Sequence, residues 1–232
     1  TVTKLWDRLL SDHDQVVHIP MSSGLSSSCE MAMAMAAQEP YEGRVFVVDN
    51  QRISVTQYQS VRDALMLIGQ GADGAQIKKR LEETAKDSVI FITVDTLKYL
   101  KKGGRITPAA AALGTLLKIK PVLIIRGEKL DAYAKARTVK QAKSVMLTAI
   151  QKELETRLHD GECRRCHLAI AHTNNEEAAL EFKKEVAERY PYADVIMAPL
   201  SLSIACHIGP GSLAVTATRK MDEEYEEDHG AV

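Results

Sequence analysis

Hydrophobic and polar positions in the first part of the chain predict strands that alternate with helices. Short apolar runs at residues 15–19 and 44–48 are bounded by turn-forming or polar residues, which is typical of buried strands. The spacing of apolar positions predicts helices over residues 1–10 and 29–38, a longer helix from 54 to the glycines at 69 and 71, and another from 73. Alternating strands and helices form parallel sheets covered by helices. We therefore expect a parallel α/β arrangement over residues 1–86.

From residue 88 onward the pattern predicts a different arrangement. Strands are expected at residues 89–94, 119–125, 129–134, 167–171, 194–198 and 213–217, and helices at 96–102, 109–117, 138–158 and 176–190. The two apolar runs on either side of residues 126–128 indicate a hairpin, hence antiparallel pairing. The expected fold class is α/β with two domains. An N-terminal parallel α/β domain (1–86) precedes a C-terminal α+β domain with a largely antiparallel sheet (87–220), and an acidic tail (221–232) is expected to be disordered.

Several helix ends carry recognisable signals. Pairs with capping-box spacing precede two predicted helices, Ser27 with Glu30 and Ser54 with Gln57. Asp73 and Gln76 are expected to start a third helix. Two glycines, 103 and 104, are expected to end the helix that begins at 96. Thr107 followed by Pro108 supplies an N-cap and a first-turn proline for the next helix.

Composition narrows the class of protein. The chain has 232 residues, of which 45% are hydrophobic and only 5% aromatic, so an aliphatic core is expected. A formal net charge of −1 gives no electrostatic reason to bind nucleic acid or an anionic membrane surface. No apolar run is long enough to span a bilayer, so no stable membrane insertion is expected. Four scattered cysteines do not form a disulfide framework, and with no signal peptide apparent at the start we expect a reducing cytoplasm.

A serine-rich loop at residues 22–26 is the first candidate for chemistry. It follows a predicted strand and precedes a predicted helix, where backbone N–H groups and the helix dipole favour an anion. Its members are Ser22, Ser23, Gly24, Leu25 and Ser26. The hydroxyls would add donors, and Gly24 would let the backbone approach a ligand. The alternative is that these serines only cap the helix and shape the turn.

Two further loops offer a cation and an imidazole. Arg105 follows the two glycines that end a helix, so it is either a ligand-facing cation or a surface arginine. His207, followed by Gly209 and Gly211, either faces a cleft or packs as an ordinary core histidine.

Other residues indicate alternatives to an anion-binding site. Cys163, Cys166 and His167 spell C-x-x-C-H, the attachment pattern of c-type haem, but no second C-x-x-C pair completes a four-cysteine zinc site. A serine-dependent acyl hydrolase remains an alternative, although the G-x-S-x-G pattern is absent. The chain also lacks the P-loop and G-x-G-x-x-G phosphate patterns.

Taken together, five segments resemble the DegV family, in the family's order. They are residues 19–26 (IPMSSGLS), 47–50 (VVDN), 99–106 (YLKKGGRI), 119–123 (IKPVL, with Gly127 and residues 135–137 after it) and 207–211 (HIGPG). The resemblance extends from about residue 1 to about residue 219. Small departures at residues 26–28, at Asn50 and at Ile208 affect details of ligand geometry.

The resemblance implies a bacterial two-domain protein that binds a long-chain fatty acid and has no catalytic residues, cofactor or metal of its own. A separate kinase would convert the presented acid to an acyl-phosphate for phospholipid synthesis. By motif, Ser22 and Ser23 with the neighbouring backbone would bind the carboxylate, His207 would join that hydrogen-bond network, and Arg105 would line the head-group end or contact the phosphate and partner. Flexible side chains at Met31, Met33 and Met35 suit either an acyl tunnel or an ordinary core.

One departure from the family is large. Members open with a strand ending in Thr-Asp-Ser, followed by a Thr-Ser-Gln-Pro segment whose threonine helps hold the carboxylate, and neither segment occurs here. The expectation is that the first domain lacks its opening strands and that the sequence is a fragment.

Overall fold

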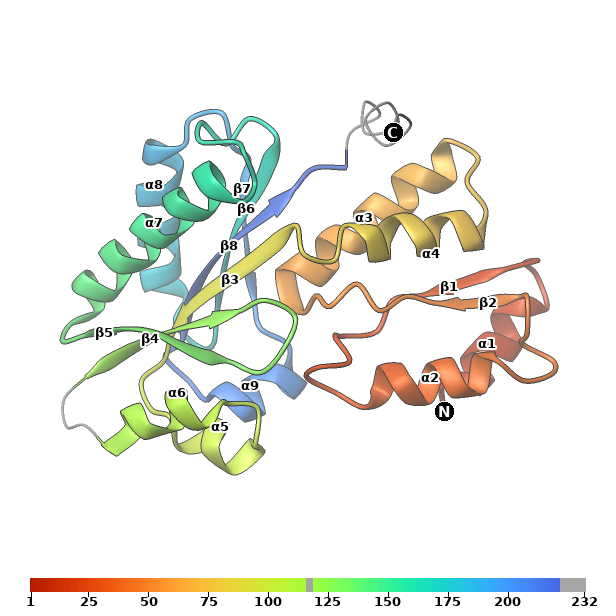
Figure 1. Ribbon diagram of the computed structural model, residues 1–232, viewed down its shortest axis with the longest axis horizontal. Coiled ribbons are helices and arrows are strands. Elements are labelled where there is room, and N and C mark those ends of the chain that lie inside the picture. The colour runs from red at the N-terminus through yellow and green to blue at the C-terminus, as the bar shows by residue number, and fades with distance from the viewer. Residues whose placement is uncertain (116–118, 222–232) are drawn as a thin grey trace.

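The N-terminal part of the chain forms a small parallel sheet between two pairs of helices. The computed structural model describes residues 1–115 and 119–221. The elements of this part are α1 (Val2–Leu10), β1 (Val16–His18), α2 (Ser28–Ala36), β2 (Val45–Val47), α3 (Ser54–Gly69) and α4 (Gly74–Glu83). β1 and β2 pair in parallel. Apolar side chains of α1 and α2 pack on one face of this pair and those of α3 and α4 on the other. Figure 1 shows the two pairs of helices on opposite sides of the two strands.

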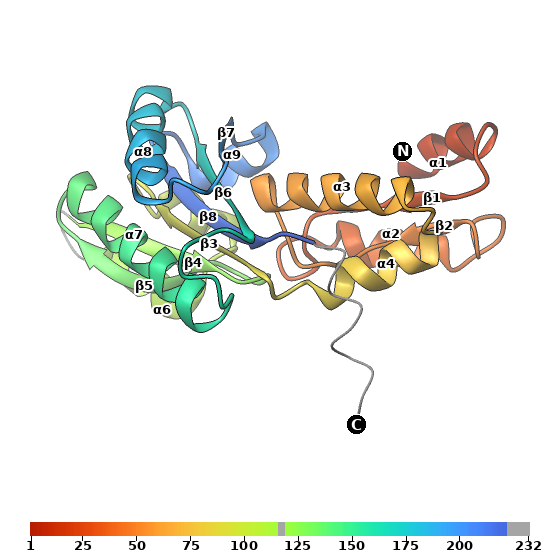
Figure 2. The ribbon, with the colours of Figure 1, turned by 90° about the horizontal axis from the view of Figure 1, so that it is seen from above.

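The C-terminal part forms a six-stranded sheet, which lies at the opposite end of the molecule from the small one (Figure 1 and Figure 2). Its elements are β3 (Ser88–Thr93), α5 (Lys98–Gly103), α6 (Pro108–Ala112), a 3-10 turn (Leu113–Thr115), β4 (Lys120–Ile125), β5 (Asp131–Ala136), α7 (Val139–Thr156), β6 (Cys166–His172), α8 (Glu176–Arg189), β7 (Val195–Pro199), α9 (Leu202–Ile208) and β8 (Leu213–Arg219). The strand order is β5-β4-β3-β8-β6-β7, and only β6 and β7 pair in parallel. The predicted fold class, a parallel sheet followed by a largely antiparallel one, is confirmed.

The two faces of the large sheet bury different sets of side chains. Because side chains alternate across a strand, Val89 and Phe91 of β3 face the cluster under α7 and α8, whereas Ile90 and Ile92 face the other side. On that second face, Leu25 and Val55 from the N-terminal part join the same core cluster. The predicted boundary at residue 86 falls in the connection between α4 and β3. The division into separate domains remains a prediction.

The predicted helix ends are partly correct. Asp73 and Gln76 form a reciprocal capping box at α4, Thr107 caps α6, and Gly104 ends α5 in the left-handed conformation. The boxes expected at Ser27 and Ser54 are wrong. The side chain of Ser27 makes no capping bond, and α3 begins instead with the Thr56 hydroxyl accepting the Ile53 N–H.

Two other predictions differ from the structure. The helix expected over residues 109–117 ends at Ala112 and continues as the 3-10 turn, and its last two residues lie outside the described chain. α9 was missed, because its seven residues are too few for a clear helical period. Apart from Met221, the predicted acidic tail also lies outside the described residues.

Within residues 1–115 and 119–221, none of the helices combines the length and apolarity that crossing a membrane requires.

A buried ion pair joins the segment before α3 to the middle of that helix, and a hydrogen bond from the same arginine reaches the end of α4. Nη1 of Arg52 lies 3.5 Å from Oδ2 of Asp63, and their side chains are 1% and 6% exposed. Nη2 of Arg52 also donates to the Thr84 carbonyl (2.9 Å), and Gln59 donates to Asp63 (2.7 Å). Removing one partner of such a pair leaves a buried charge without compensation.

We therefore expect Asp63→Ala to lower the free energy of unfolding by about 3 kcal/mol or more. Glu83→Ala is the matched control, because its pair with Lys79 spans 3.9 Å with the two side chains 77% (Lys79) and 46% (Glu83) exposed, and the loss expected there is under about 1 kcal/mol. Urea denaturation monitored by circular dichroism measures both. Similar small losses in the two variants would contradict this role of Asp63.

Candidate functional site

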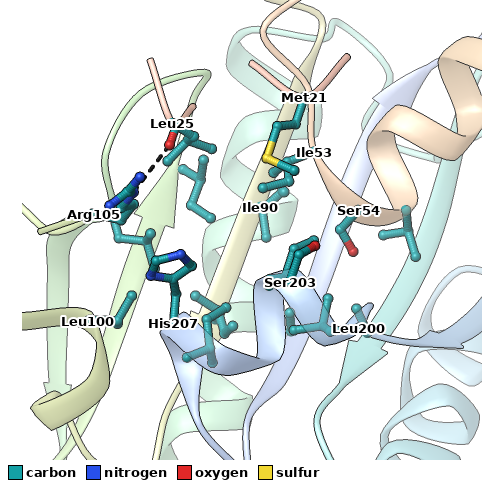
Figure 3. A pocket seen from close by; sticks show the side chains of 18 of the residues that line it. Met21, Leu25, Ile53, Ser54, Ile90, Leu100, Arg105, Leu200, Ser203 and His207 are labelled. Carbon is teal, nitrogen blue, oxygen red and sulfur yellow. Dashed lines mark hydrogen bonds between the residues drawn. The ribbon is translucent and has the colours of Figure 1, made fainter. Parts of the chain in front are cut away.

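A cavity of about 200 Å³ lies on the face of the large sheet opposite α7 and α8. Its walls come from strands β3, β4, β6 and β8, from helices α5 and α9, from the first turn of α3, and from the segments that precede α2 and α3. Most of the lining is aliphatic, as Figure 3 shows. The lining residues are Met21, Leu25, Ser26, Ile53, Ser54, Val55, Ile90, Ile92, Leu100, Arg105, Ile125, Leu130, Ala171, Leu200, Ser203, Ile204, His207, Ile208, Ala214 and Thr216. Such a space suits a mainly apolar ligand.

Arg105 is the cation in this lining. It follows the left-handed Gly104 that ends α5, and its own backbone carbonyl accepts the Leu130 N–H (2.9 Å), so its position is fixed against the β4–β5 hairpin. Its Nε donates to the Leu25 carbonyl (3.3 Å), and its Nη1 donates to the Gly103 carbonyl. An arginine has five N–H donors, and in the described part of the chain no carboxylate pairs with this one. Donors remain for an anion in the cavity.

His207 lies beside Arg105 on the same side of the cavity (Figure 3). It projects from the last turn of α9. Across residues 1–115 and 119–221 the imidazole has no hydrogen-bond partner. The ring packs so closely on α5 that a Cβ added to Gly103 would lie 2.3 Å from its Nδ1. Glycine at position 103 therefore allows the imidazole to sit where it does.

The first serines of the 22–26 loop are engaged with the protein itself. Ser22 is fully buried, its hydroxyl donates to the Gly127 carbonyl, and its N–H donates to the Arg52 carbonyl (2.9 Å). The hydroxyl and N–H of Ser23 both donate to the Asp49 carboxylate. A hydroxyl has one hydrogen, so in this arrangement both serines fix the loop. Neither side chain lines the cavity, and neither hydroxyl donates to a histidine.

The rest of the loop approaches the cavity. Leu25 and Ser26 line it, and the Ser26 hydroxyl donates to the Ser28 hydroxyl (3.0 Å). Gly24 packs against the hairpin turn, where an added Cβ would lie 2.7 Å from the Gly127 carbonyl oxygen. The structure thus brings Leu25, Ser26, Arg105 and His207 to one cavity. Residues 22–24 lie behind the cavity wall and hold the loop in place.

Gly209 and Gly211 shape the chain after α9 and do not line the cavity. Both have positive φ angles, 82° and 81°. An added Cβ would lie 2.4 Å from the Tyr99 ring at Gly209, and 2.2 Å from the Asp95 carboxylate at Gly211. This close packing holds the end of α9, and with it His207, against α5 and the β3–α5 connection.

Sequence reasoning missed several lining residues. Val55 and Ser203 belong to no motif, and Ser54 was expected only to cap a helix. In the structure Ser54 has a positive φ of 60°, which is unusual for a serine. The methionines considered for an acyl tunnel lie elsewhere: Met31 is 62% exposed, and Met33 and Met35 pack around Trp6 and the small sheet. Met21 is the methionine in the lining.

The cysteine pair is a buried thiol cluster. Cys163 and Cys166 are free and fully buried, and the Cys163 thiol donates to the Cys166 carbonyl (3.7 Å). A hydrogen bond with Cys163 and burial raise the pKa of the Cys166 thiol far above its ordinary value. Metals bind the thiolate form. No group of three or more His, Cys, Asp or Glu in the described residues is placed to hold a metal ion.

Comparisons with known proteins agree on one family. The model of the family described as "Uncharacterised protein, DegV family" matches residues 2–220. DegV of Bacillus subtilis is 30% identical over 213 residues, which covers 91% of this chain and 73% of the relative. A DegV domain-containing protein of Deinococcus radiodurans is 31% identical and covers 89% of this chain and 70% of its own length.

Solved structures of the family have the same fold. A DegV family protein from Thermus thermophilus, described as binding fatty acid, is 32% identical with a TM-score of 0.82, over 93% of this chain and 75% of the other. The structure of Bacillus subtilis DegV, described as a fatty acid binding protein, is 28% identical with a TM-score of 0.79, over 94% of this chain and 75% of the other.

The contact between Gly103 and His207 gives a test of the site's construction. Gly103→Ala is expected to lower the free energy of unfolding by about 1–3 kcal/mol, because the new methyl group overlaps the imidazole. In a His207→Ala background the overlap is gone, and alanine is the better helix former by about 1 kcal/mol. The same substitution should there be neutral or stabilising. Equal losses in both backgrounds, measured by denaturant unfolding, would show that Gly103 does not seat His207.

Proposed function

The chain belongs to the DegV family, and we propose from this and from its cavity that it binds a long-chain fatty acid. The observation that carries the proposal is the pairing of an aliphatic cavity with Arg105 and His207 on one side of it. Family members from Thermus thermophilus and Bacillus subtilis are described as fatty-acid-binding proteins, which supports the same ligand here.

The apolar walls supply the affinity in this proposal. Burying an acyl chain contributes about 0.8 kcal/mol per methylene group, so a chain of about 16 carbons gives roughly 12 kcal/mol before the costs of association. Tight binding then needs few polar contacts, which matches a lining with few polar side chains.

The head group is proposed to lie between Arg105 and His207, with Ser26 at the edge. A carboxylate without donors is costly to bury, and a guanidinium with unused N–H groups offsets that cost through charge-assisted hydrogen bonds. Direct binding by Ser22 and Ser23 remains a prediction. In our proposal their main contribution is to hold the loop so that the Leu25 carbonyl orients Arg105.

We further propose that the protein presents the acid to a separate kinase and performs no chemistry itself. The family resemblance supports this role, as does the absence of P-loop and G-x-G-x-x-G patterns from the sequence. The partner would act on the carboxylate at the Arg105 side and form an acyl-phosphate for phospholipid synthesis. No observation favours the acyl hydrolase, since the hydroxyls of Ser22 and Ser23 are bonded to Gly127 and Asp49.

Fatty acid binding and the role of Arg105 can be tested together. Native mass spectrometry of protein expressed in bacteria should find a mass increment equal to a fatty acid. Arg105→Ala should raise the Kd for that acid at least about tenfold, since a hydrogen bond to a charged group contributes about 1.5–3 kcal/mol. Arg137→Ala, at an exposed position outside the cavity lining, is the matched control and should bind as the wild type does.

Two outcomes count against the proposal. Wild-type protein that takes up no fatty acid from an added mixture would refute the ligand. Undiminished affinity in Arg105→Ala would refute the assignment of Arg105 to the head group.

A further inference from the structure

The floor of the cavity changes in side-chain size across the sheet. Cross-strand register places one row of inward side chains in the order Ile125, Ile90, Thr216, Ala169, Ile196, and a second in the order Ile92, Ala214, Ala171, Ala198. Isoleucines therefore lie under the β4 and β3 end, and smaller side chains lie under β8 and β6. Adjacent strands are about 4.8 Å apart, so neighbouring side chains in a row are separated by about that distance across the floor.

Arg105 defines one end of this path. Its backbone is bonded to Leu130, beside the β4–β5 hairpin. Leu200 lies toward the other end, where its N–H donates to the carbonyl of His172 at the end of β6. Figure 3 shows Arg105 and Leu200 on opposite sides of the cavity. An acid held at Arg105 would extend its chain from β4 over β3 and β8 toward β6.

A second, much smaller cavity continues in the same direction. It has a volume of about 10 Å³ and shares two lining residues with the first, Val55 and Thr216. Its floor includes Ala169 and Ile196, the next two positions of the first row. The side chain of Val55, in the first turn of α3 and 5% exposed, therefore stands in the wall between the two spaces.

Several polar side chains border the space beyond this wall. Arg62, His167 and Asp194 border the small cavity, together with Gln59 and Thr218. Extending an apolar chain into this space would desolvate those groups without replacing their hydrogen bonds, which is unfavourable. The side chain of Val55 and the polar groups behind it thus both end the apolar path at the same position.

We infer that Val55, over Thr216, sets the length of the acyl chain that the cavity accepts. The inference rests on the proposed fatty acid binding and adds to it a residue that determines specificity. Val55 fills the end of the path, and the alanines at positions 171 and 214 leave the space that the last carbons occupy.

The test is a competition among straight-chain fatty acids of about 12 to about 20 carbons, with bound species identified by native mass spectrometry. Val55→Ala should move the preferred length upward by about two carbons, because it removes two methyl groups from the wall. Ala171→Val should move it downward by filling the floor. Each methylene group that no longer fits in the cavity should lower the affinity of that acid about fourfold relative to an acid that fits, which corresponds to about 0.8 kcal/mol.

Leu130→Ala is the matched control, because it removes buried atoms at the Arg105 end. It should weaken binding of all lengths without changing their order. If the wild type binds acids and neither Val55→Ala nor Ala171→Val changes the preferred length, the inference is wrong while the proposed function stands. If the wild type binds none, the proposed function itself fails. Should Val55→Ala not fold, which thermal unfolding would reveal, Ala171→Val alone decides.

Discussion

A guanidinium without an acidic partner, facing an aliphatic cavity, is the constraint on which the site depends. Arg105 donates only to two backbone carbonyls, and the described residues give it no carboxylate. A cation beside low-dielectric walls is best satisfied by an anion, and the walls themselves favour an apolar occupant. The fatty acid that we propose as ligand would meet both demands at once, with its carboxylate at Arg105 and its chain over the sheet.

Close backbone packing places the polar groups of this site. Gly24 lets the serine loop rest on the turn at Gly127, and Gly103 lets His207 rest on α5. Gly209 makes a similar contact with Tyr99. Each contact joins segments far apart in the chain, so the geometry of the head-group end depends on the N-terminal loop, the hairpin and α9 together.

Much of the fold was predictable because its signals are local. Periods of 2 and 3.6 residues identified most of the strands and helices, and the capping box at Asp73 and the stop at Gly104 follow from neighbouring residues. The short helix α9 was not found, since seven residues provide too little periodicity.

The site was predictable only in part, for a physical reason. Arg105 and His207 stood out because glycines surround them. The partner of the Ser22 hydroxyl, Gly127, lies 105 residues away, and nothing in the sequence near Ser22 indicates it. Val55 looks like any buried valine in the sequence, and only the fold shows that it lines both cavities together with Thr216.

A crystal structure of the protein with its bound acid tests the central claim most directly. We expect elongated electron density over β3 and β8, with the carboxylate roughly 2.7–3.2 Å from a nitrogen of Arg105 and the methyl end against Val55. Density with the head group turned away from Arg105, or a cavity that stays empty after soaking with excess acid, would contradict it.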